Sequence, residues 1–153
     1  MKLVQLQLKQ TGSMPNDKLT IAYRRLHHLL SVAETKSHSD TLIDKINLKI
    51  QMLNSSNKMN TALYRLVNLT ENEIINLLEQ DLKIVPKGHY TKKWQALGIA
   101  TFGIPIGVAI GLLSKNMGFL GIGLPLGVGI GALIGKRKDA EAAAQGRQYD
   151  LAG

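Results

Sequence analysis

The four histidines are the residues of this chain best suited to bind a metal ion or carry a proton. His27 and His28 are adjacent, whereas His38 and His89 stand apart. The chain has no cysteine to complete a zinc site, and neighbouring residues of a helix point to different faces. We therefore interpret the adjacent pair as part of a solvated helix surface and expect no metal site.

No other group of residues has the pattern of a catalytic site. The chain shows no nucleophile paired with a base and no carboxylate pair in an apolar setting. The glycine-rich run from Gly103 to Gly111 lies inside apolar sequence, whereas phosphate-binding glycine loops follow a strand. We expect the protein to be no enzyme and to use no cofactor.

Charged residues are divided sharply along the chain. Residues 1–90 contain twelve Lys or Arg and eight Asp or Glu, whereas residues 94–135 contain only Lys115. This division predicts water around the first part and lipid around the second. The net charge of +8 would fit a nucleic-acid binder, but much of the excess flanks the apolar run. We expect the lipid bilayer as a partner and no nucleic acid.

The apolar run is long enough for two membrane-spanning helices, 94–113 and 117–134. A helix of about 20 residues covers roughly 30 Å, the thickness of the hydrocarbon core. The polar turn Ser114–Asn116 separates the two spans. Basic and aromatic residues, which suit the membrane interface, flank them. These are Lys87, Tyr90, Lys92, Lys93, Trp94, Lys136, Arg137 and Lys138.

The basic residues also predict an orientation. Most of them lie at the outer ends of the two spans, and the turn carries only Lys115. The positive-inside rule therefore places both termini in the cytoplasm and the turn outside. Residues 1–9 contain no apolar run long enough for a signal peptide, so we expect residues 1–90 to stay on the side of synthesis.

The two spans share a glycine pattern. Glycines recur at every fourth residue, so each set lies on one helix face and lets another helix approach closely. The expected helix-packing residues are Gly103, Gly107, Gly111, Gly123, Gly127, Gly131 and Gly135. Pro105 and Pro125 follow the first glycine of each run by two residues and are the expected helix kinks. They also disfavour a β or amyloid-like strand.

Folding the chain about Lys115 predicts a register for the hairpin. Gly103 then lies opposite Gly127, and Gly107 lies opposite Gly123. In this register Gly131 and Gly135 face Ile99 and Gln95. Part of the second glycine stripe would then stay free for another copy.

With this motif, residues 94–135 resemble bacterial small membrane proteins that have a glycine-zipper two-helix hairpin. The resemblance implies insertion into a membrane, which we expect to be the bacterial inner membrane, and tight association of helices. Such zippers occur in anchors, assembly factors and pore-formers, so the resemblance implies no single activity. It does not extend to residues 1–90.

We expect residues 16–85 to form an amphipathic helical domain, because this range contains neither Gly nor Pro. Apolar residues recur every three or four positions and predict buried stripes. The first stripe is Leu19, Ala22, Leu26, Leu29, Leu30 and Ala33. The next is Leu42, Ile43, Ile46, Ile50 and Leu53, then Leu63, Leu66 and Val67. The polar segment 54–57 either interrupts one long helix or separates two. Thr70 and Glu73 have the spacing of a capping box and predict the start of a last helix.

Three further segments complete the organisation. Residues 1–15 form an N-terminal arm whose alternation at Val4, Leu6 and Leu8 predicts either a strand or a frayed helix. Residues 86–93 form a basic and aromatic linker into the membrane. Residues 136–153 form a basic and then polar cytoplasmic tail.

The sequence thus predicts an all-α protein with a cytoplasmic helical domain and a transmembrane hairpin. We expect a membrane-anchored, oligomerising scaffold or assembly protein, with residues 16–85 recruiting an unidentified cytoplasmic protein. The alternative is a pore-forming or membrane-disrupting protein, such as a toxin, a defence effector or a holin-like protein. The first is favoured because Gly-x-x-x-Gly patterns supply helix packing directly.

Overall fold

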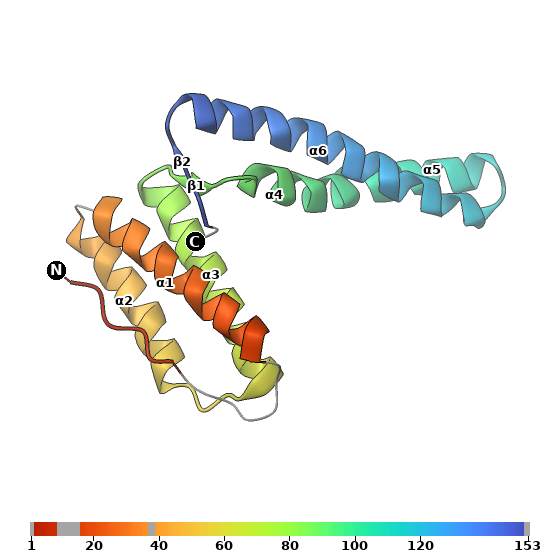
Figure 1. Cartoon of the computed structure of the whole chain (residues 1–153). Coiled ribbons are helices and arrows are strands. Elements are labelled where there is room, and N and C mark those ends of the chain that lie inside the picture. Colours follow the sequence, from red (N-terminus) through yellow and green to blue (C-terminus); the bar gives the residue numbers. More distant parts are fainter. Residues whose placement is uncertain (1, 9–15, 37–38, 152–153) are drawn as a thin grey trace. The chain divides into compact units, whose positions relative to one another are not determined.

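The computed structural model describes residues 2–8, 16–36 and 39–151, and these confirm the all-α fold class (Figure 1). The chain divides into two compact units. The first contains residues up to Val85 together with the segment from Tyr149 onward, and we call it the helical domain. The second runs from Pro86 to Gln148 and contains the helical hairpin.

Three helices build the helical domain: α1 (Asn16–Lys36), α2 (Asp40–Ser55) and α3 (Asn60–Asp81). Consecutive helices run antiparallel (Figure 1). The predicted stripe positions on α1 and α2 are all buried, and so are Leu63 and Val67 of the continued second stripe, whereas Leu66 is only partly buried. The core cluster also takes in Tyr23 of α1 and Leu63, Val67, Ile74, Ile75 and Leu78 of α3.

The chain breaks between α2 and α3, but it does not break again at the predicted capping box. Helix α3 is continuous from Asn60 to Asp81, so a helix start at Thr70 is wrong. The buried face of α3 continues through this point, and Thr70 lies on it with 4% exposure. Burial of this face outweighs the local signal, because a cap contributes only about 1 kcal/mol whereas packing of the apolar face supplies most of a helix's stability.

The second unit is a hairpin of two long helical segments. The first contains α4 (His89–Gly98), a π-helical turn (Ile99–Gly103) and α5 (Ile104–Leu113). The second contains a short 3₁₀ turn (Met117–Phe119) and α6 (Leu120–Ala144). Helix α6 continues ten residues past Ile134, the expected end of the second span. The predicted entry linker is likewise helical from His89 onward.

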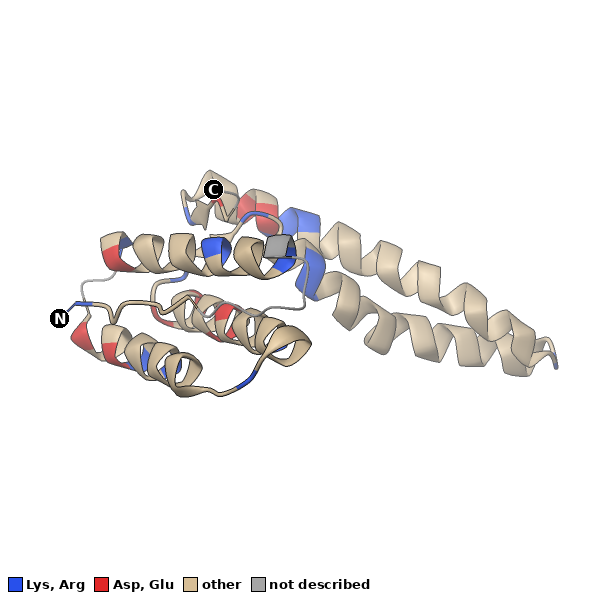
Figure 2. Ribbon diagram, turned by 60° about the horizontal axis from the view of Figure 1, so that its bottom comes forward, with Lys and Arg blue, Asp and Glu red and all other residues tan. Residues whose placement is uncertain are grey.

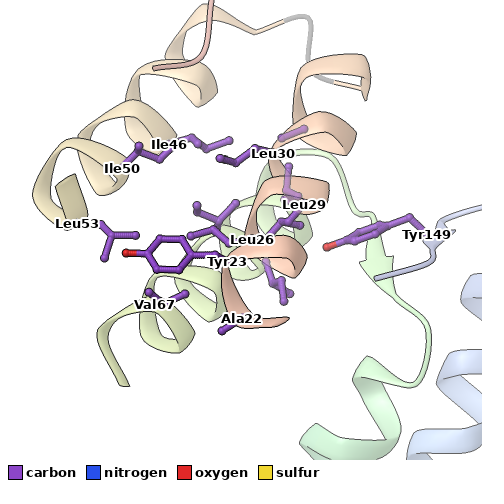
Figure 3. Close-up of a cluster of buried hydrophobic side chains, with 14 of the residues drawn as sticks. Ala22, Tyr23, Leu26, Leu29, Leu30, Ile46, Ile50, Leu53, Val67 and Tyr149 are labelled. Atoms are coloured by element: carbon purple, nitrogen blue, oxygen red, sulfur yellow. The ribbon is translucent and has the colours of Figure 1, made fainter. Parts of the chain in front are cut away.

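The chain after α6 is not the polar tail that the sequence predicts. Gly146 ends the helix at φ 64°, and the N–H of Arg147 donates to the carbonyl of Ala142 at 2.9 Å. Strand β2 (Gln148–Tyr149) then pairs with β1 (Val85–Pro86). Tyr149 is buried in the core cluster of the helical domain, beside Leu29 of α1 (Figure 3). Its aromatic ring makes burial favourable in a segment whose other residues are mostly polar.

The described part of the N-terminal arm, residues 2–8, is neither a helix nor a strand. Leu8 is 74% exposed, which breaks the alternation predicted from Val4 and Leu6. The prediction of a strand or frayed helix is therefore wrong for these residues, and residues 9–15 lie outside the described part. Residues 2–8 pair with no strand among the described residues, and side chains of α2 bond to their backbone instead.

Candidate functional site

The two segments of the hairpin meet through glycine. A Cβ atom built on Gly123 would overlap the backbone of Gly103 and would lie 2.6 Å from Cα of Gly107. A Cβ on Gly127 would lie 2.7 Å from Cα of Gly103. Only glycine permits this backbone-on-backbone contact, because real Cβ atoms cannot approach so closely. Gly107 therefore faces Gly123 and Gly103 faces Gly127, in the register described above.

Gly98 extends this surface, although sequence reasoning missed it. A Cβ on Gly98 would overlap the carbonyl oxygen of Gly127. Gly98 lies five residues before Gly103, outside the four-residue repeat. The π turn between them closes a bond from the N–H of Ile104 to the carbonyl of Ile99, five residues back. This wider turn absorbs the extra residue and keeps Gly98 on the same face.

The π turn also lies just before Pro105, the first predicted kink residue. Pro105 has no N–H, and its ring would clash with the carbonyl four residues earlier in a regular helix. That carbonyl belongs to Thr101, which lies inside the π turn. Pro125 lies within α6, which continues through it.

Near the ends of the hairpin, the glycines meet different partners from those that the register predicts. Gly131 packs on the backbone of Trp94 and Gln95, and a Cβ on Gly135 would lie 2.5 Å from Cα of Thr91. The prediction that these two glycines stay partly free for another copy is therefore wrong. The π turn adds one residue to the repeat, so that Gly98 rather than the predicted Ile99 also lies against Gly131.

At the open end of the hairpin, a carboxylate of α6 links the two helical segments. Asp139 of α6 accepts hydrogen bonds from the backbone N–H of Tyr90 at 3.1 Å and of Thr91 at 2.9 Å. The Thr91 hydroxyl donates to the same carboxylate at 2.7 Å. These groups lie in the first turn of α4, so Asp139 caps this helix from another helix. Nothing in the local sequence marks Asp139 for this role, because capping motifs use neighbouring residues.

A second contact at this end joins Lys138 to Trp94. The Lys138 ammonium lies 5.6 Å from the centre of the Trp94 ring, within the range of a cation–π interaction. The other predicted interface lysines and arginine are exposed at the same end of the hairpin: Lys87, Lys92, Lys93, Lys136 and Arg137. Figure 2 shows these basic ribbons at one end and an uncharged length beyond them.

The closed end of the hairpin is a tight turn. Lys115 adopts φ 50°, and the N–H groups of Lys115 and Asn116 donate to the carbonyls of Leu112 and Gly111. This pair of bonds ends the helix as a Schellman motif, with lysine at the position that glycine usually occupies. The Asn116 side chain then accepts from the N–H of Gly118 at 2.9 Å and caps the next turn. Most N–H groups of the turn are thus bonded within the turn itself.

The large apolar side chains of the hairpin point outward. Leu113 is 86% exposed, Leu133 is 67% exposed and Leu126 is 47% exposed. Both segments are long and apolar enough to cross a membrane. In the most apolar stretch of each, only 22% and 17% of residues are buried. A core helix of a water-soluble protein would instead be mostly buried.

An ion pair in the helical domain joins the buried carboxylate of Glu71 to Arg25, whose side chain is 41% exposed. The Arg25 guanidinium donates to the Glu71 carboxylate at 2.9 Å and to the Asn68 side-chain oxygen at 2.8 Å. Burial, and then the negative charge of Glu71, raise the pKa of Tyr149 above its usual range. These contacts join α1, α3 and the segment after α6 within the domain.

The described histidines do not converge on one site, and His38 lies outside the described residues. His28 contacts the backbone carbonyl of Asp150 at 2.9 Å, whereas His27 lines a hollow beside the N-terminal arm. Among the described residues, no group of three His, Asp or Glu could hold a metal ion.

Comparison with known proteins finds no match to any family model, any curated protein or any solved structure.

Proposed function

We propose that this protein is a membrane-anchored scaffold or assembly protein. The hairpin packs in the bilayer, the helical domain lies in the cytoplasm, and the domain recruits another protein. In this proposal both termini are cytoplasmic, and the membrane is the bacterial inner membrane.

The outward apolar surface of the hairpin carries the proposal. Side chains such as Ile122 and Leu126 are 46% and 47% exposed, while Gly103, Gly107, Gly123 and Gly127 fill the interior. In water this arrangement would leave most of the apolar area unburied, which is unfavourable. In lipid the exposed apolar area carries no such penalty, because the surrounding acyl chains are equally apolar.

The same surface favours an anchor over a pore. A water-filled channel needs polar groups along its lining, and the described spans present apolar side chains outward. The glycine face is used within one hairpin, so it offers no lining either. Self-association would need another face of the hairpin, such as the one that carries Gly121 and Gly129, around which there is open space.

Extraction of membranes tests the anchor. The full chain should stay in the membrane pellet after alkaline carbonate washing. The double variant Ile122→Asp with Leu126→Asp should be released, since each charge near the bilayer centre costs about 3 kcal/mol. Leu48→Asp with Met52→Asp, two exposed positions of α2, is the matched control and should stay in the pellet. Release of the unmodified chain would refute the anchor.

Two further measurements examine orientation and the alternative function. A cysteine replacing Asn116 should react with an impermeant thiol reagent on intact cells, and one replacing Ala140 should not. Reversed labelling would refute the proposed orientation. Expression should leave a trapped dye inside cells, and leakage that depends on the hairpin would instead support a pore-forming protein.

A further inference from the structure

The N-terminal arm occupies a slot formed by two asparagines of α2. Asn47 accepts from the N–H of Val4 at 2.8 Å and donates to the carbonyl of Lys2 at 3.2 Å. Asn54 repeats this arrangement: it accepts from the N–H of Gln7 at 3.0 Å and donates to the carbonyl of Gln5 at 2.9 Å. Figure 1 shows the arm running along α2.

The two asparagines have the spacing that an extended chain requires. They are seven residues apart, which is about 10.5 Å along a helix. The arm residues whose N–H groups donate to them, Val4 and Gln7, are three residues apart, which is about 10 Å in an extended chain. Because the bonds use only backbone N–H and C=O groups, the slot accepts any extended peptide that fits beside it. An asparagine amide suits this role because it carries both a donor and an acceptor.

The arm does not fill the groove in which it lies. On the side of α1, a hollow of about 260 Å³ is lined by Leu3, Leu6, His27 and Leu30, among others. A second hollow of about 250 Å³ is lined by Leu6, Leu8, Tyr23 and His27, among others. Leu6 borders both hollows, so a larger side chain at its position would extend into them.

The arm is also separable from the domain that it covers. Its side chains at Leu3, Val4 and Leu6 are only partly buried, whereas the fully buried core residues come from the rest of the domain. The arm can therefore leave without opening the core. As a tethered segment it has an effective concentration of about the millimolar range, so a competitor must make better contacts.

We propose that this slot binds an extended peptide segment of another protein, with an aromatic residue at the position of Leu6, and that the arm is its tethered placeholder. This deepens the proposed function, because it rests on recruitment by the helical domain and names the chemistry of the partner. The aromatic ring fills the hollows beside Tyr23 and His27 that Leu6 leaves open.

Peptide binding to the chain lacking residues 2–8, held in detergent micelles, tests the slot. The probe is a fluorescent peptide of residues 2–8 with capped ends, read by fluorescence anisotropy. The peptide should bind, and the double variant Asn47→Ala with Asn54→Ala should weaken its affinity at least about tenfold. N-methylation of the peptide at Val4 and Gln7, which removes the two N–H donors, should weaken binding to the same extent. N-methylation at Gln5, which contributes its carbonyl, is the matched control.

The nature of the occupant is tested with a second peptide. A Leu6→Phe peptide should bind about fivefold more tightly than the original and should bind the full chain by displacing the arm. Equal binding of both peptides, or binding indifferent to N-methylation, would overturn the proposal. A photo-crosslinker at Gln7 that joins full chains only to one another would also overturn it, because the occupant would then be a second copy. None of these readouts depends on membrane insertion, so failure here is distinct from failure of the anchor.

Discussion

The helical domain and the hairpin are both helical, but they distribute their side chains in opposite ways. In the helical domain, large apolar residues such as Leu26 and Ile46 are fully buried. In the hairpin, glycines such as Gly123 face inward and leucines such as Leu133 face outward. The same backbone geometry thus serves two different surroundings.

The difference shows what holds each pair of helices together. Each large side chain buried in the helical domain contributes about 1.5–3 kcal/mol through removal from water. Lipid offers no such gain, so helices there associate through close contact and hydrogen bonds. The hairpin uses the closest contact available, backbone against backbone, and adds the Asp139 cap at its open end. Substitutions that exploit this contrast should act differently in the two regions.

The largest effect is expected from Gly123→Leu. The new side chain would overlap backbone atoms of Gly103 and Gly107, which cannot move aside independently. The hairpin should separate, at a cost above about 3 kcal/mol. Distances between spin labels at Leu97 and Leu133 would measure this. Gly129→Leu, on the same helix with open space around it, is the matched control and should leave the distances unchanged.

Leu26→Ala should have the next largest effect, on the helical domain alone. Leu26 is fully buried, so its loss leaves a cavity and lowers the free energy of unfolding by about 3 kcal/mol. Urea unfolding of the full chain in micelles, followed by circular dichroism, would report it. Leu48→Ala, at a position that is 57% exposed, should change stability by less than about 0.5 kcal/mol. An equal effect of both would contradict the described core.

Asp139→Ala should weaken the hairpin by about 1–2 kcal/mol, as expected for loss of a helix cap. The N–H groups of Tyr90 and Thr91 lose their acceptor. Hydrogen exchange at these two amides should become faster, while exchange at the closed end should not change. Asp139→Asn keeps one acceptor oxygen, so its exchange rates should lie between those of the unmodified chain and of Asp139→Ala. Unchanged exchange in Asp139→Ala would mean that the cap does not form.

Tyr149→Phe should have the smallest effect and should stabilise the protein by about 1 kcal/mol. The Tyr149 hydroxyl is buried and has no hydrogen-bond partner among the described residues, so its removal relieves an unfavourable burial. The pKa of Tyr149 is raised, so the folded state favours the protonated form. Stability should therefore fall as pH rises above about 10, by at most about 1.4 kcal/mol per pH unit.

The same variant supplies the control for this pH dependence. Urea unfolding between pH 9 and pH 11 should show a steeper loss of stability for the unmodified chain than for Tyr149→Phe. Parallel curves would contradict the burial of the hydroxyl.

The sequence alone determined the features that depend on local periodicity. The stripes of α1 and α2 follow from apolar spacing, and all their predicted positions are buried. The two long apolar helices and the turn at Ser114–Asn116 follow from the distribution of charge. The pairing of Gly103 with Gly127 follows from the antiparallel fold about that turn. Each of these features depends on residues close together in the chain or on simple symmetry.

Only the tertiary structure decided the features that depend on distant partners. Thr70 looked like a helix start because its neighbours form a capping box, but burial against α1 and α2 keeps α3 continuous. Asp139 and Tyr149 act on residues more than forty positions away, so no local pattern marks them. Gly98 joined the glycine face because a π turn changed the helix phase. Local free-energy preferences of about 1 kcal/mol are outweighed wherever packing of a whole face is at stake.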